Sequence, residues 1–195
     1  MQVLGINQGT SGNVSVRTDT GFLITPSAIA YDSMLVEHIV AMDMDGQPVG
    51  DARPSSEWRL HRDVYHHFAQ ANAVIHTHSV FCTALACLRR SIPAFHYMVA
   101  VAGGSDIRCT EYATLGTQAL ADNIIMALTG RRACLIANHG MVCYGDDLDR
   151  ALSLANEVET LAKQYWHACQ LGEPNILSAE DMQEVLDAFV DYWNS

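Results

Sequence analysis

The sequence predicts a single domain of the α/β class. Its 195 residues suit one globular domain, and apolar residues make up 49% of the chain, enough to bury a sizeable core. Short apolar runs typical of strands alternate along the chain with segments whose apolar residues recur at helical spacing. Because no repeat, low-complexity tract or Pro/Gly/Ser-rich linker divides the chain, we expect residues 1–195 to form one domain.

Six segments are predicted strands, because apolar and β-branched residues lie between turn-forming residues. The turn Asp19-Thr20-Gly21 separates the first two, and Asp45-Gly46 follows the third. The fourth and fifth, AVIHT and ACLIA, have the composition of buried strands. In chain order the segments are residues 14–16, 21–25, 38–44, 73–77, 133–137 and 141–144.

Five helices are predicted from apolar residues three or four positions apart. The first begins at the serines of PSSE (residues 54–57), and the longest begins near Asp146 or Asp147 and ends at Gly172. Residues 80–88 form a short helix, and Ser178 with Asp181 opens the last. The apolar stripes are Leu60, Val64 and Phe68; Leu115, Leu120, Ile124 and Leu128 within residues 114–128; Leu154, Val158, Leu161, Tyr165 and Trp166; and Met182, Val185, Leu186 and Phe189.

The charge of the chain argues against several classes of partner. A net charge of −11 disfavours nonspecific binding to nucleic acid or to an anionic membrane, since both need a basic surface. No apolar run reaches the roughly 18–20 residues of a membrane span, and the opening MQVLGINQGT has no signal-peptide pattern.

The six cysteines form no C-x-x-C pair. Reduced thiols and a cytoplasmic location are therefore expected.

The basic residues limit the chemistry, because ten are arginine and only Lys163 is lysine. An enzyme that forms a lysine imine would have to use this residue, which lies in the longest predicted helix and far in sequence from every motif.

Two histidines form the pattern H-x-H in the strand at residues 73–77 and just beyond it. His76 and His78 are two positions apart, so in extended chain they point to the same face. His139 follows a second apolar strand, and Glu57 stands at a helix start. Three histidines and a carboxylate fit a catalytic zinc site. Five other histidines are expected on the surface or as hydrogen-bonded core residues; they are His38, His61, His66, His67 and His167.

Three loops carry hydroxyl and amide groups suited to an anion. Residues 8–13 (QGTSGN) precede a strand, Ser55 and Ser56 lie at a helix start, and Ser27 follows Thr25-Pro26. Backbone N–H groups in such loops, and at a helix start, bind phosphate. A plain tight turn and an ordinary helix cap remain open as alternatives for the first two.

The order and spacing of these motifs resemble the class II aldolase/adducin family, in particular its bacterial L-fuculose-1-phosphate aldolase branch. The matching segments run from about residue 4 to about residue 170; they are GINQGTSGNVSVR, LITPSAIAYDSM, RPSSEWRLHRDVY, ANAVIHTHSVFCTALACLRRSIPAFHYMVAVAGG, YATLGT and ANHGMVC. The resemblance implies a single α/β domain with a central, mostly antiparallel sheet flanked by helices, assembled as a homotetramer with active sites between neighbouring subunits.

The resemblance also implies roles for individual residues. His76, His78, His139 and Glu57 match the zinc ligands, and Glu57 doubles as the catalytic acid/base. Tyr97 matches a tyrosine that acts as proton donor in the neighbouring subunit's site. The matching phosphate-binding positions are Gly12, Asn13, Ser27, Ala28, Ser55 and Ser56.

Two departures from the family pattern are present. Ala28 stands where the third phosphate loop usually has glycine, so a positive φ there would disturb the phosphate site. The family's usual N-terminal helix, about fifteen to twenty residues, is expected to be missing before Leu4-Gly5.

The implied activity is the zinc-dependent cleavage of a phosphorylated ketose, a ketose 1-phosphate such as L-fuculose 1-phosphate, into dihydroxyacetone phosphate and an aldehyde. Open alternatives are an aldolase for 5-deoxyribulose or 5-methylthioribulose 1-phosphate, a pentulose-5-phosphate 4-epimerase and a methylthioribulose-phosphate dehydratase. A non-enzymatic adducin-like module is disfavoured because Glu57 and the three histidines are all present.

Overall fold

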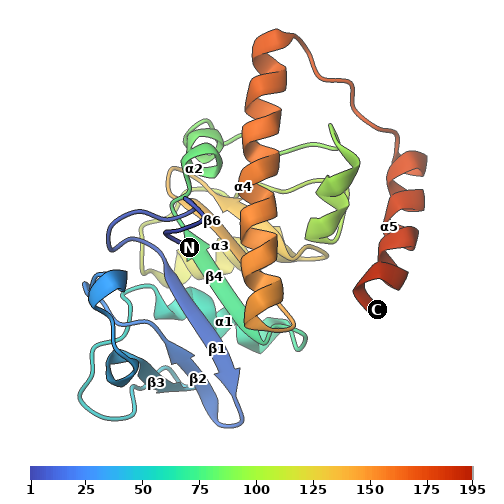
Figure 1. The fold of residues 1–195 in the computed structure, drawn as a ribbon. Helices are drawn as coiled ribbons and strands as arrows, with labels where there is room; N and C mark the ends of the chain where they lie inside the picture. Colours follow the sequence, from blue (N-terminus) through green and yellow to red (C-terminus); the bar gives the residue numbers. More distant parts are fainter. Residues whose placement is uncertain (195) are drawn as a thin grey trace.

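The computed structural model of the chain describes residues 1–194, with side chains through residue 189. In this part of the chain, six strands form one sheet in the order β3-β2-β1-β4-β6-β5, and each neighbouring pair is antiparallel (Figure 1). The strands are β1 (Asn13–Thr18), β2 (Gly21–Ile24), β3 (Val40–Asp43), β4 (Ala73–Thr77), β5 (Ala133–Ile136) and β6 (Gly140–Gly145). The predicted α/β class with an antiparallel sheet flanked by helices is confirmed.

Four α-helices lie on the two faces of this sheet, and a fifth, at the C-terminal end of the described residues, stands to one side of it (Figure 1). They are α1 (Trp58–His67), α2 (Val80–Cys87), α3 (Gln118–Leu128), α4 (Leu148–Leu171) and α5 (Ala179–Asn194). Figure 1 shows α4 in front of the sheet, with α1 and α3 behind it. Among the described residues, no helix combines the length and apolar character that crossing a membrane requires.

The core is divided by the sheet because neighbouring strand residues point to opposite faces. Val74 and Val142 pack in a buried cluster with α1 and α3, whereas Ile75 and Cys143 pack in a second cluster with α2 and α4. Each fully buried aliphatic side chain contributes about 1.5–3 kcal/mol to stability. The two clusters hold β4 and β6 firmly in the middle of the fold.

The helix predicted at residues 114–128 begins four positions later than its pattern indicated. Thr117 caps α3, its hydroxyl oxygen accepting from the backbone N–H of Leu120 at 3.3 Å. Gly116 has a positive φ of 72°, which ends any helical path before it. Leu115 therefore lies in a loop, where its side chain is 62% exposed.

Other segments and one side chain also differ from the prediction. The strand predicted at residues 38–44 is shortened because Val36–His38 form a 3₁₀ turn. Two other 3₁₀ segments, η1 (Tyr31–Ser33) and η3 (Tyr97–Ala102), were not predicted. Trp166, placed in the apolar stripe of the longest helix, is 39% exposed at the edge of that stripe.

Two loops far apart in sequence run side by side at one end of the sheet. The backbone N–H of Ser55 donates to the carbonyl of Thr25 at 3.1 Å, and that of Ser27 donates to the carbonyl of Arg53 at 3.2 Å. Pro26 and Pro54 form the bridge between these bonds. The contact brings two hydroxyl-bearing segments, predicted separately, next to one another.

Gly12 ends the polar loop before β1, at a point where the chain passes close to β4. Its φ is +72°, and a Cβ there would lie 2.6 Å from the carbonyl oxygen of His76. A side chain at this position would both strain the backbone and push β1 away from β4.

We predict that Gly12→Ala lowers the free energy of unfolding by about 2 kcal/mol or more, because the left-handed conformation and the backbone clash both carry a cost. Gly9→Ala is the matched control, since Gly9 has a φ of +60° with no atom within 4 Å of the added Cβ. It should lose only about 1 kcal/mol. Denaturant unfolding of both variants measures the difference, and equal losses would show that the contact with β4 is unimportant.

Candidate active site

Three histidines converge at the end of β4 and at the turn between β5 and β6. The rings of His76, His78 and His139 lie 4.7–4.9 Å apart by their centroids, each nearly perpendicular to the next. The Nε2 atoms of His76 and His78 are 3.0 Å apart. The H-x-H prediction, that both imidazoles project to one side, agrees with this geometry.

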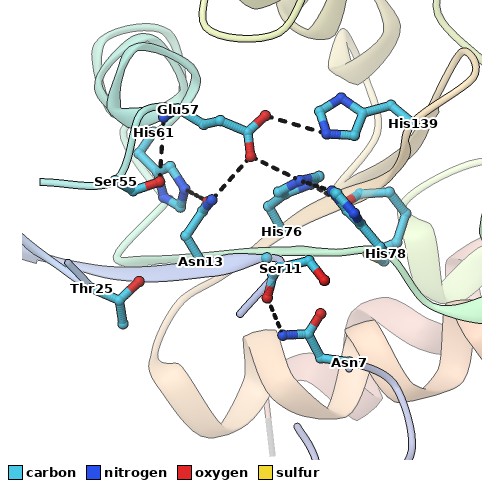
Figure 2. Close-up of polar contacts among 12 residues, drawn as sticks. Asn7, Ser11, Asn13, Thr25, Ser55, Glu57, His61, His76, His78 and His139 are labelled. Carbon is cyan, nitrogen blue, oxygen red and sulfur yellow. Dashed lines mark hydrogen bonds and ion pairs between the residues drawn. The ribbon is translucent and has the colours of Figure 1, made fainter. Parts of the chain in front are cut away.

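Glu57 completes the cluster from the N-cap position of α1. One carboxylate oxygen, Oε2, lies 3.2 Å from Nε2 of His76, and the other, Oε1, lies 3.4 Å from Nε2 of His139 (Figure 2). One donor atom from each of the four residues falls within 4.8 Å of all the others. The structure thus brings together the full predicted set of metal ligands.

The surroundings of these donors fit a metal ion. Nδ1 of the buried His76 donates to the carbonyl oxygen of Met141 at 2.8 Å, which leaves its Nε2 lone pair directed into the cluster. Oε1 of Glu57 is buried and accepts no hydrogen bond from the described residues. An orphaned carboxylate oxygen facing imidazole nitrogens is the arrangement that a cation satisfies.

The protonation of the cluster follows from burial and mutual charge. Burial disfavours the charged form of His139, and a positive His76 adds to the effect, so the pKa of His139 falls to about 4. The pKa of His78 is lowered for the same two reasons. Burial would raise the pKa of the Glu57 carboxyl, but His76, His139 and Asn13 together hold it well below its usual range. Burial lowers the pKa of His76, but the adjacent Glu57 carboxylate raises it by more, so a metal ion would displace a proton from this ring, whereas His78 and His139 favour their neutral forms.

A strained turn carries His139 into the cluster. Asn138 has a φ of +57°, a left-handed conformation that asparagine tolerates better than most residues. Its backbone N–H donates to the carbonyl of Ala86 at 3.0 Å, and its side-chain oxygen accepts from Nε of Arg89 at 3.2 Å. These contacts with the end of α2 hold the turn, and with it the direction of the His139 ring.

A cavity of about 220 Å³ opens beside the cluster. All six predicted phosphate-binding residues line it, and Glu57, His78 and His139 also contribute to its wall. Its lining residues are Thr10, Ser11, Gly12, Asn13, Pro26, Ser27, Ala28, Ser55, Ser56, Glu57, His78, Leu115 and His139. One cavity therefore joins the metal ligands to the hydroxyl-bearing loops.

Ala28, which stands where the family usually has glycine, adopts a positive φ. Its φ is +61°, which costs an alanine about 1 kcal/mol or more relative to glycine. The loop keeps its left-handed turn despite the methyl group, and Ala28 still faces the cavity.

Tyr97 lies outside this cavity. It begins η3, its side chain is 51% exposed, and it lines a larger groove of about 620 Å³ formed with α5. The groove is mainly apolar, with Leu177, Val185 and Phe189 in its wall. Within one chain, the structure does not bring Tyr97 to the metal ligands.

Sequence reasoning missed two contributors to the site. His61, expected on the surface or as a hydrogen-bonded core residue, is a fully buried one, and it contacts Asn13, whose amide donates to Oε2 of Glu57 at 3.1 Å. The signal was its spacing, since His61 lies four positions after Glu57 and so on the same side of α1. Leu115 was assigned to a helix and instead faces the cavity.

Comparison with known proteins agrees with this geometry. The family model described as "Class II Aldolase and Adducin N-terminal domain" matches residues 1–166. A 5-methylthioribulose-1-phosphate/5-deoxyribulose-1-phosphate aldolase of Rhodospirillum rubrum is 51% identical over 189 residues, covering 97% of this chain and 86% of that protein. An L-fuculose phosphate aldolase of Escherichia coli K12 is 47% identical over 193 residues, covering 98% and 90% respectively.

A solved structure described as L-fuculose 1-phosphate aldolase has the same fold. It is 43% identical, has a TM-score of 0.91, and the match covers 94% of this chain and 88% of that one. The chain therefore belongs to the class II aldolase and adducin family and is a class II aldolase, a carbon–carbon lyase.

Proposed function

We propose that the protein is a zinc-dependent aldolase that cleaves a ketose 1-phosphate into dihydroxyacetone phosphate and an aldehyde. The observation that carries the proposal is the single cavity in which a Glu/His/His/His cluster faces hydroxyl-bearing loops. Relatives are named for 5-methylthioribulose 1-phosphate, 5-deoxyribulose 1-phosphate and L-fuculose 1-phosphate, which are all ketose 1-phosphates.

Three imidazole nitrogens and one carboxylate oxygen are a donor set typical of zinc. When bound, zinc would act as a Lewis acid that stabilises the negative charge developing on the ketone oxygen. The alternative electron sink, a lysine imine, has no residue in this cavity. Lys163 is exposed on α4, where its Nζ lies 5.6 Å from the centre of the Phe81 ring.

The hydroxyl-bearing loops supply the phosphate site in this proposal. Ser27, Ser55 and Ser56 present hydroxyl groups, and the loop ending at Gly12 and Asn13 adds backbone and amide N–H groups. These dipoles act at short range, so the net charge of −11 does not prevent an anion from binding here.

Two side chains of this chain move protons in the proposed reaction. In the condensation direction Glu57 takes a proton from C3 of dihydroxyacetone phosphate, and Tyr97 of a neighbouring subunit donates its phenolic proton to the aldehyde oxygen as the bond between C3 and C4 forms. Cleavage is the reverse: the tyrosinate takes the proton of the C4 hydroxyl, the protonated Glu57 gives a proton to C3, and exchange with solvent returns both side chains to their starting forms. The buried, ionised carboxylate of Glu57 must therefore take up its proton during the cycle.

The aldehyde end of the substrate is proposed to lie toward Leu115. This side chain is the large aliphatic one among those lining the cavity. The aldehydes released from the three ketose 1-phosphates named above all end in a methyl group, which an aliphatic side chain would accommodate.

Purified protein should release dihydroxyacetone phosphate from at least one of these three ketose 1-phosphates in a coupled retro-aldol assay. Removal of metal with a chelator should abolish the release, and added zinc should restore it, because the developing charge loses its stabilisation. Interconversion of pentulose 5-phosphates, or elimination of water, with no dihydroxyacetone phosphate formed, would overturn the aldolase proposal.

Glu57→Gln is expected to keep the fold and much of the substrate binding but to lose most turnover. The amide preserves the shape of the side chain and cannot accept and return a proton, which typically costs 10²–10⁴-fold in rate. Steady-state kinetics at saturating zinc measure the loss, with the exposed carboxylate variant Glu173→Gln as control. Turnover close to that of the wild type would remove Glu57 from the mechanism.

A homotetramer with shared active sites is the proposed assembly, supported by the exposed Tyr97 beside an apolar groove. Hybrid oligomers test it. If Tyr97 acts in a neighbour's site, mixing two inactive variants, Tyr97→Phe and Glu57→Gln, and reassembling them should restore about one quarter of the wild-type sites in a closed ring. If the two residues act within one subunit, the mixture should stay inactive.

A further inference from the structure

His61 lies behind the metal ligands, between α1 and β1. Its side chain is fully buried. One ring nitrogen, Nε2, lies 2.5 Å from Oδ1 of Asn13, and the other, Nδ1, lies 2.6 Å from the hydroxyl oxygen of Ser15. Asn13 and Ser15 are two positions apart on β1 and so face α1 together. Figure 2 shows the ring beside the Asn13 amide, on the side away from the histidine cluster.

The direction of each hydrogen bond can be derived, starting at Glu57. An ionised carboxylate only accepts, so the amide nitrogen of Asn13 must donate to Oε2, at 3.1 Å. The oxygen of that amide then faces His61, whose Nε2 must carry the hydrogen. In a neutral ring Nδ1 is consequently an acceptor, and the Ser15 hydroxyl donates to it.

The chain of hydrogen bonds continues to Tyr65. With its own hydrogen used for His61, Ser15 accepts from the Tyr65 hydroxyl at 2.7 Å. Burial lowers the pKa of His61 to about 3, an effect that the nearby His76 strengthens, so the neutral ring required by this scheme is the stable form at neutral pH. The donor and the acceptor are thus assigned for each hydrogen bond in the row that runs from Tyr65 through Ser15, His61 and Asn13 to Glu57.

We propose that His61 is a positioning residue that fixes the Asn13 amide with its N–H toward Glu57. Without the Nε2–H of His61, the amide could rotate and turn its oxygen toward the carboxylate, where two acceptors repel. Glu57 would then lose the hydrogen bond that orients it, both as a metal ligand and as the proposed acid/base. The inference rests on the proposed function for the second of these roles, but not for the first.

Three substitutions separate positioning from simple packing. The amide of a glutamine at position 61 reaches the place of Nε2 and can donate to Asn13, whereas that of an asparagine reaches only the place of Nδ1. His61→Gln and His61→Asn each keep one of the two hydrogen bonds, so they form a matched pair. Tyr65→Phe is the control, since it removes a buried hydroxyl from the same row without touching Asn13.

Zinc affinity, measured by competition with a chromophoric chelator, is the readout that does not depend on turnover. His61→Asn should weaken zinc binding and reduce kcat at saturating zinc, each about 10–100-fold, as loss of a partner behind a metal ligand typically does. His61→Gln should stay within about threefold of the wild type, and Tyr65→Phe should lower the melting temperature without changing zinc affinity. Equal losses in the two His61 variants, or no loss in His61→Asn, would overturn the inference.

These experiments distinguish a failure of the proposed function from a failure of the inference about His61. A wild-type protein that binds zinc but cleaves no ketose 1-phosphate would contradict the proposed function, while the zinc affinities would still decide the role of His61. The ring itself gives an independent check. Nitrogen-15 NMR of histidine-labelled protein, with His61→Gln to assign the signal, should show the hydrogen on Nε2, and a hydrogen on Nδ1 would also overturn the inference.

Discussion

The buried carboxylate of Glu57 is the constraint on which this end of the molecule depends. A charge removed from water must be matched by partners, and an unmatched one carries a cost of several kcal/mol. Here His76, His139 and Asn13 surround it, and one oxygen is left without a hydrogen bond. A bound cation would complete the set. The same group that the proposed reaction needs is thus also the group that the fold must neutralise.

The register of the sheet places His76 and Asn13, two of the partners of Glu57, next to one another. β4 lies between β1 and β6, with His76 directly opposite Asn13 on one side and Val142 on the other. The α1 and α3 side of β4 therefore carries Val74 and the candidate metal ligand His76, and the α2 and α4 side carries Ala73, Ile75 and the buried Thr77. Because a shift of one position would turn His76 into the opposite layer, the two buried clusters fix the site as well as the fold.

Residues with strained backbone conformations lie around the same cavity. The non-glycine residues with positive φ in the described part of the chain are Ala28, Arg89 and Asn138. Ala28 lines the cavity, Asn138 precedes His139, and Arg89 hydrogen-bonds to Asn138. Such conformations persist where the surrounding structure over-determines them, and they are common at functional sites. The local cost is offset by the packing of the sheet behind it.

The sequence by itself determined the class of fold, the strand at residues 73–77 and the four residues of the candidate metal site. Period-two spacing places His76 and His78 on one side, and an apolar strand before His139 predicts its place at a strand end. Local spacing says nothing about contacts between distant segments. Only the tertiary structure showed that residues 25–27 pair with residues 53–55. It also showed that Leu115 lies in the cavity wall rather than in a helix, and that the His61 ring contacts the Asn13 amide. Those positions follow from strand register and from helix packing across the sheet, which depend on the whole chain rather than on any one segment of it.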